Sequence, residues 1–237
     1  MEFLSNEGQA ELARLLDTHA QPPLLFQPAS QGTQHAILRS ILESPSDGSF
    51  TISMGASQLH FNACLQKDIY AITEPANYIS FLVALAHHYS RGTVHIGSNS
   101  PSDPPEIDPR YLSHPIDLEI LSRHMCYVHT IAATKPLTSS IEDGGKRLLD
   151  GVDISTSDAA KEHVKRNVIT HKHPCGTCTM LPKENGGVMD ERLKVHGVKN
   201  LRVVDASIFP MIPRGNIQSS VYTVAERAAE LVEHDWK

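Results

Sequence analysis

The 237-residue sequence has few cysteines, no long apolar run and no cluster of basic residues. Its four cysteines, Cys64, Cys126, Cys175 and Cys178, are too few for the disulfide framework of a small secreted scaffold. The longest apolar run, 79–86, is much shorter than the roughly 20 residues that a membrane-spanning helix needs. We therefore expect neither a disulfide-stapled protein nor one embedded in a membrane.

Other features are also missing. The formal net charge is −6 and no run of Lys or Arg occurs, so we expect no nucleic-acid partner. No Asn-x-Ser/Thr sequon is present, and the first seven residues lack the basic and apolar regions of a signal peptide. We expect a cytoplasmic protein. Hydrophobic residues at 40% and charged residues at 20% are typical of a globular chain.

Hydrophobic spacing predicts both helices and strands. The predicted helices begin at Asn6, Glu74, Asp117, Asp158 and Val221, and the last one turns Val224, Ala228, Leu231 and Val232 inward. The predicted strands are 50–54, 59–65, 69–73, 93–96 and 201–204. Segments 22–32 and 101–109, rich in Pro or polar residues, are predicted as loops. Strands joined by local turns and then helices favour an α+β fold with an antiparallel sheet.

The segment 171–178 is the richest in chemically active side chains. Cys175 and Cys178, with His171 and His173, have spacing compatible with a tetrahedral zinc site, although residues so close in sequence cannot easily all reach one ion. A redox dithiol is a second interpretation, but a C-x-x-C pair needs a following helix, and Pro182 interrupts it. In the third interpretation His173 is a general base and the cysteines are small buried apolar residues. We predict no metal.

A family resemblance favours the third interpretation. The segment His173-Pro174-Cys175-Gly176-Thr177-Cys178-Thr179-Met180 resembles the His-Pro-x-Gly-Thr-x-x-Met motif of the glucose-methanol-choline (GMC) oxidoreductases. The similarity continues in order along the chain, at segments 90–94, 105–112, 187–190, 193–198, 200–207, 215–216 and 225–229. Each motif is weak by itself, whereas the ordered set is specific. The resemblance covers about 90–232.

The resemblance implies a substrate-binding domain over 1–175 and, over 176–237, the C-terminal strand-loop-helix portion of an α/β domain that binds FAD. It implies oxidation of a small-molecule alcohol, with hydride transfer to the flavin N5. His173 matches the family's base, and Asn216 matches the second position, which is filled by His or Asn. The residues implied to lie against FAD are Asp205, Ala206, Asn216, Ile217 and Gln218. The N-terminal dipole of the helix from Val221 would favour a negatively charged reduced ring.

Two departures from the family pattern are clear. Ser220-Val221 stands where the family often has Pro-Thr, and no G-x-G-x-x-G fingerprint occurs anywhere in the chain. That fingerprint belongs to the Rossmann unit holding the ADP half of FAD, so an upstream Rossmann-containing polypeptide is an expected partner. Three hypotheses follow: an FAD-dependent alcohol oxidase or dehydrogenase, a truncated non-catalytic remnant or binding module, and a non-redox cyclase or dehydratase on the same fold.

Overall fold

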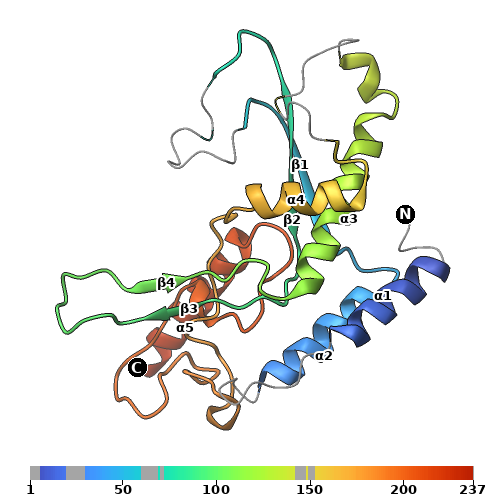
Figure 1. Cartoon of the computed structure of the whole chain (residues 1–237). Helices are drawn as coiled ribbons and strands as arrows, with labels where there is room; N and C mark the ends of the chain where they lie inside the picture. Colours follow the sequence, from blue (N-terminus) through green and yellow to red (C-terminus); the bar gives the residue numbers. More distant parts are fainter. Residues whose placement is uncertain are drawn as a thin grey trace.

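A computed structural model describes residues 6–19, 30–59, 69, 72–141, 148 and 153–236. Figure 1 shows two strand pairs, with α3 and α4 beside the β1–β2 pair and the C-terminal helix α5 near the β3–β4 pair. Both strand pairs are antiparallel, which confirms the α+β prediction. None of the described helices is both long enough and apolar enough to cross a bilayer.

The longer strand pair joins β1 (Phe50–Ala56) to β2 (Ile79–Leu85), with Phe50 opposite Leu85 and Ala56 opposite Ile79. The prediction of a helix from Glu74 into this region was wrong, because residues 79–85 are a strand. The run contains Ile79, Phe81 and Val83, residues that suit a pleated surface, and pairing with β1 decides its conformation. Most of the predicted strands 59–65 and 69–73 lies outside the described residues, and Ile72 and Thr73 are not in a strand.

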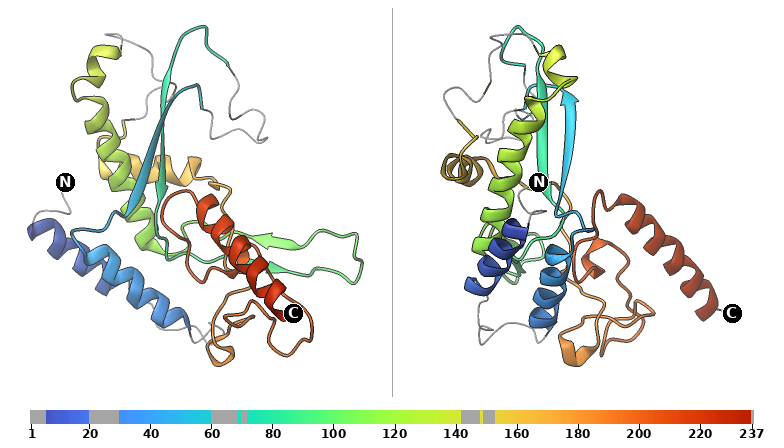
Figure 2. Two further views of the ribbon diagram at one scale, coloured as in Figure 1. Left: turned by 180° about the vertical axis from the view of Figure 1, so that it is seen from behind. Right: turned by 90° about the vertical axis from the view of Figure 1, so that its right-hand side faces the viewer.

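The shorter pair, β3 (Thr93–His95) and β4 (Glu106–Asp108), forms a hairpin that projects from the body of the molecule (Figure 2). The strand predicted at 93–96 is confirmed as β3. β4 lies in a stretch that was predicted to be irregular. The strand has only three residues, between Pro105 and Pro109, and so short a segment shows no clear alternation of apolar and polar residues.

The first core forms where three helices meet. α1 (Asn6–Thr18) and α2 (Ser30–Glu43) lie side by side and pack near the start of α3 (Pro115–Ala132), as both views of Figure 2 show. This core buries Leu12, Leu16, Leu38, Tyr89, Ile116 and Ile120. α2 begins inside the segment 22–32 that was predicted as loop. α4 (Ser157–Asn167) packs on α3, close to the predicted helix from Asp158.

The second core lies in the C-terminal part, under α5 (Gln218–Asp235). Its buried members are Met189, Leu193, Ile208, Ala228 and Leu231. Of the residues predicted to face inward, Ala228 and Leu231 do so and Val224 packs against them, whereas Val232 is 37% exposed. The end of α5 is held by Asp235, whose carboxylate pairs with Arg192, Lys194 and Arg202.

The prediction of a buried strand at 201–204 was wrong. In this segment only Arg202 forms a bridge, to Lys194, and the side chains of Leu201 and Val204 are 48% and 39% exposed. A buried parallel strand needs neighbouring strands on its edges, and the described residues supply none here. The separation into two cores is compatible with the predicted boundary at 175/176, which itself stays a prediction.

Candidate active site

His173 lies in the loop that follows α4. Lys172 adopts a positive φ of 61°, and its backbone N–H donates to Thr170 Oγ1 at 2.9 Å, which turns the chain sharply before the histidine. The His173 ring meets the His171 ring edge-on, with centroids 4.7 Å apart. Burial lowers the pKa of His173, and the adjacent His171 lowers it further. A neutral imidazole that is only partly buried can therefore accept a proton at neutral pH.

The loop after His173 is joined by its backbone to the segment that follows residue 205. The Cys178 N–H donates to the Ser207 carbonyl at 3.0 Å, and the Met180 N–H donates to the Ile208 carbonyl at 2.9 Å. Gly176, which lies between His173 and Cys178, has a φ of +88°, a conformation that strongly favours glycine. The fold thus brings the motif around His173 against the turn that begins at Asp205.

Asp205 caps the short 3-10 helix Ala206–Ile208, because its Oδ1 accepts the Ser207 N–H at 2.8 Å. The carboxylate is exposed, whereas the Ser207 hydroxyl oxygen is buried and has no hydrogen-bond partner among the described residues. A buried hydroxyl normally has a partner, so this turn offers an unused polar group beside the Asp205 carboxylate.

Asn216 follows Gly215, which has a φ of +78°. The Asn216 Oδ1 accepts the Gln218 N–H at 2.9 Å, so one side of the carboxamide caps α5. Its NH2 group is left free to donate, and the residue is exposed. The Ile217 side chain is buried at 5% exposure, while Gln218 is exposed. No hydrogen bond joins the described side chains of His173 and Asn216, and their convergence on one face stays a prediction.

The residues present fit one edge of an anionic cofactor. The first turn of α5 has backbone N–H groups without intrahelical acceptors, and Ile217 at its N-cap supplies no side-chain cap. Such a helix end favours negative charge. The start of α5 therefore suits a negatively charged, polar edge of a flavin nucleotide. No residue of the chain supplies the glycine-rich cradle for the rest of the nucleotide.

The thiol interpretations fit the geometry less well. Cys175 and Cys178 are free, and burial raises the pKa of the Cys175 thiol, whereas a redox dithiol needs a lowered pKa. Within the described part of the chain, no three His, Cys, Asp or Glu side chains are arranged to hold a metal ion.

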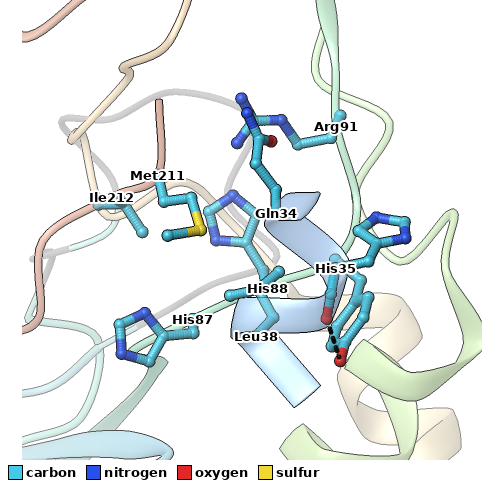
Figure 3. Close-up of a pocket in the computed structure, with 9 residues that line it drawn as sticks. Gln34, His35, Leu38, His87, His88, Arg91, Met211 and Ile212 are labelled. Carbon is cyan, nitrogen blue, oxygen red and sulfur yellow. Dashed lines mark hydrogen bonds between the residues drawn. The ribbon is translucent and has the colours of Figure 1, made fainter. Parts of the chain in front are cut away.

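A small pocket is lined by side chains of α2 and of the segments 87–91 and 211–212. Figure 3 shows His88, Met211 and Ile212 among the lining residues, with Gln34 and Arg91 near each other. Side chains fill most of it, leaving room for about one water molecule. Sequence reasoning did not assign a role to Arg91, although the segment 90–94 already contributed to the family resemblance.

The structure thus has a partly buried histidine with a lowered pKa on one loop, and an exposed carboxamide at the start of α5. Comparison with known proteins gives the family. The model of the GMC oxidoreductase C-terminal region, described as "GMC oxidoreductase", matches residues 88–225, more than half of the chain. The chain belongs to the GMC oxidoreductase family, and this membership indicates FAD as the cofactor.

Three similar proteins illustrate the relationship. Dehydrogenase mpl7 of Monascus purpureus is 36% identical over 158 residues, which is 66% of this chain and 24% of the dehydrogenase. A fungal aryl-alcohol oxidase structure superimposes with a TM-score of 0.70 at 24% identity, covering 98% of this chain and 37% of the oxidase. Pyridoxine 4-oxidase from "Mesorbium loti" gives a TM-score of 0.66 at 29% identity, covering 81% and 36%. The chain spans about a quarter of the length of the curated relatives it matches.

Proposed function

We propose that this chain supplies the substrate-binding domain, and the residues that border the flavin, of an FAD-dependent oxidoreductase that acts on CH–OH groups. The carrying observation is His173, a partly buried imidazole whose pKa is lowered, on a loop hydrogen-bonded to the Asp205 turn. Family membership supports the cofactor and the general reaction. The aryl-alcohol oxidase and pyridoxine 4-oxidase among the similar structures suggest a primary alcohol on an aromatic ring as the substrate class.

In the proposed reaction, a His173 ring nitrogen accepts the hydroxyl proton of the alcohol. The O–H electron pair then forms the carbonyl bond as the C–H bond breaks. Bound FAD supplies the acceptor for the departing hydride. The free NH2 of Asn216 donates a hydrogen bond to the substrate oxygen, which holds the alcohol in line with the base. General base catalysis typically contributes a factor of about 10² to 10⁴.

The flavin would be held by the Asp205 turn and the start of α5. The first-turn N–H groups of α5 would donate to polar atoms of the cofactor. Asp205, Ala206, Ile217 and Gln218 form the backbone that borders it. Because the Ile217 side chain is buried, we expect its contact to come from the main chain.

The remaining half of the nucleotide requires a partner. Leu201, Val204 and Tyr222, all in the C-terminal part of the chain, are 48%, 39% and 63% exposed. We propose that a Rossmann FAD-binding unit, in the same polypeptide or a separate one, covers these apolar side chains. A non-catalytic binding module is the second candidate.

The decisive experiment substitutes His173→Ala in the flavin-loaded protein that includes the Rossmann unit. With benzylic primary alcohols as probes, we expect kcat to fall by about 10² to 10⁴. His171→Ala is the matched control, because it removes an exposed neighbouring ring and leaves the base. Unchanged turnover in His173→Ala would exclude the assigned base, and no turnover of any alcohol by the native protein would favour the binding module.

The His171→Ala variant should also change the pH dependence of kcat/KM. His173 acts as a base only when neutral, so the acid limb of kcat/KM reports its pKa. The charge of His171 lowers that pKa, so His171→Ala should move the acid limb to higher pH. A limb that stays in place or moves to lower pH would contradict the assignment.

A further inference from the structure

A buried carboxylate anchors the turn that precedes β3. Asp117, in the first turn of α3, is 2% exposed. Its Oδ1 accepts the Tyr89 N–H at 2.8 Å and its Oδ2 accepts the Ser90 N–H at 2.7 Å. The Ser90 hydroxyl in turn accepts the His114 N–H at 3.0 Å. Charge-assisted bonds of this kind fix backbone geometry strongly, so the next residue, Arg91, starts from a rigid base.

Arg91 reaches from this turn to both loops of the candidate site. Its Nη2 donates to the Pro210 carbonyl at 3.1 Å. A Cβ added to Gly176 would lie 3.0 Å from the same nitrogen and 3.3 Å from the Phe209 carbonyl. The guanidinium therefore lies against the bare Cα of Gly176 and, at the same time, against the chain at 209–210.

The charge of Arg91 has no carboxylate at ion-pair distance within the described residues. It acts on its surroundings instead: burial lowers the pKa of His35 and Arg91 lowers it further, while Arg91 opposes the rise that burial causes at Cys175. An arginine without a carboxylate partner, half-buried between two loops, is costly unless its contacts are needed there.

We propose that Arg91 is a positioning residue, which sets the placement of the His173 loop relative to the loop that leads to Asn216. This inference rests on the proposed function for its catalytic consequence. Asp117 fixes where the arginine starts, and Gly176 and Pro210 mark the two loops that it holds together. A displacement of about 1 Å at a reacting geometry can cost about 100-fold in rate.

The first test needs this chain alone. Arg91→Met keeps an apolar side chain of similar length and removes the guanidinium. We expect faster amide hydrogen exchange, by about tenfold or more, at Cys178 and Met180, whose N–H groups bond to Ser207 and Ile208. Amides in α3 should be unchanged. Arg227→Met, which removes an exposed arginine of α5 paired with Glu230, is the control and should change neither set. The proposal would be overturned if Arg91→Met raised exchange rates equally throughout the chain, or if it left the rates at Cys178 and Met180 unchanged.

The second test uses the flavin-loaded protein with benzylic alcohols. Arg91→Met should lower kcat by about 10- to 100-fold and leave the acid limb of the pH profile in place, because only burial and His171 lower the pKa of His173. Arg91→Lys, which keeps a donor for Pro210, should restore part of the rate. Unchanged kcat in Arg91→Met overturns the catalytic consequence.

Arg91→Gln keeps the proposal testable if Arg91→Met folds poorly. It keeps a polar side chain and removes the guanidinium that donates to Pro210, so it should produce the same exchange pattern at Cys178 and Met180. If the native protein oxidises no alcohol while both variants still loosen those amides, the proposed function fails and the positioning role stands. If alcohol oxidation occurs and neither variant affects it, the positioning role fails alone.

Discussion

His124 makes the fold sensitive to acid. It lies in α3 at 5% exposure, its ring stacks on Phe50 of β1 at 3.7 Å, and its Nε2 shares a hydrogen bond with Ser49 Oγ at 3.0 Å. Burial lowers the pKa of His124 from 6.5 to about 3. The unfolded chain therefore takes up a proton at this residue first as the pH falls, and it is stabilised relative to the folded chain.

The size of the effect follows from the two pKa values. The contribution is complete above pH 6.5 and is lost as the pH falls towards about 3. Linkage gives a loss of about 1.4 kcal/mol at pH 5.5 and about 2.7 kcal/mol at pH 4.5. Burial also lowers the pKa values of five other histidines, His35, His87, His88, His114 and His163. The free energy of unfolding of the whole chain should therefore fall by more than the contribution of His124 alone.

The variant His124→Phe isolates this residue. It keeps the aromatic contact with Phe50 and removes the titrating group, but it leaves the Ser49 hydroxyl without its partner. We expect it to be less stable than the native chain by about 1–3 kcal/mol at pH 7.5. The gap should then shrink by about 1.4 kcal/mol at pH 5.5 and about 2.7 kcal/mol at pH 4.5.

Urea unfolding followed by far-ultraviolet circular dichroism, at pH 7.5, 6.5, 5.5 and 4.5, measures these differences. Two controls accompany it. Ser49→Ala removes the hydrogen bond and keeps the histidine, and His95→Gln removes an exposed histidine of β3. If the stability gap between native and His124→Phe is the same at pH 7.5 and 4.5, the burial argument for His124 is wrong.

Three further outcomes are expected. The chain purified alone should show little or no flavin absorbance near 450 nm, and stoichiometric bound FAD would contradict the need for a Rossmann partner. Gly187→Ala should lower the free energy of unfolding by about 3 kcal/mol or more, because its Cβ would lie 1.7 Å from the Leu181 carbonyl oxygen. Gly32→Ala, in open space on α2, should raise the free energy of unfolding by up to about 0.5 kcal/mol, and urea unfolding measures both changes. Asp235→Asn should speed amide exchange at the end of α5 equally at pH 7 and 5, because three cations hold the pKa of Asp235 far below its usual range; an effect seen only at pH 5 would refute this.

Short-range patterns predicted α1, α3, α4 and α5, but they missed α2 and placed a helix where β2 lies, and they predicted the strands unevenly. α3, α4 and α5 have apolar spacing that repeats over several turns, so their existence was clear from the sequence. The run 79–85 also places apolar residues at helical spacing, and only its pairing with β1, some 30 residues earlier, makes it a strand. Segment 201–204 has the composition of a buried strand but lacks strand neighbours here. Such outcomes depend on contacts that no local window contains.

The residues of the candidate site also differ in how far the sequence could predict them. His173 and Asn216 were found because their motifs are contiguous and resemble a family pattern. Arg91 and Asp117 were not assigned roles, because each acts through backbone groups of other segments. Asp117 binds two N–H groups 27 and 28 residues away, and Arg91 binds a carbonyl 119 residues away. A carbonyl acceptor has no side-chain identity, so no pairing of residue types in the sequence could indicate it.

The position of Arg91 follows from how the two cores are connected. Ile208 is buried in the C-terminal core, whereas Met211, three residues later, packs against the core formed by α1, α2 and α3. The segment between them therefore spans both cores, and Pro210, the acceptor for Arg91, lies within it. The loop after His173 pairs with Ser207 and Ile208, just before this segment, and Asn216 follows the segment in the chain. Any relative movement of the two cores would thus shift the proposed base against its partner, and the Arg91–Pro210 bond lies where it would resist that movement.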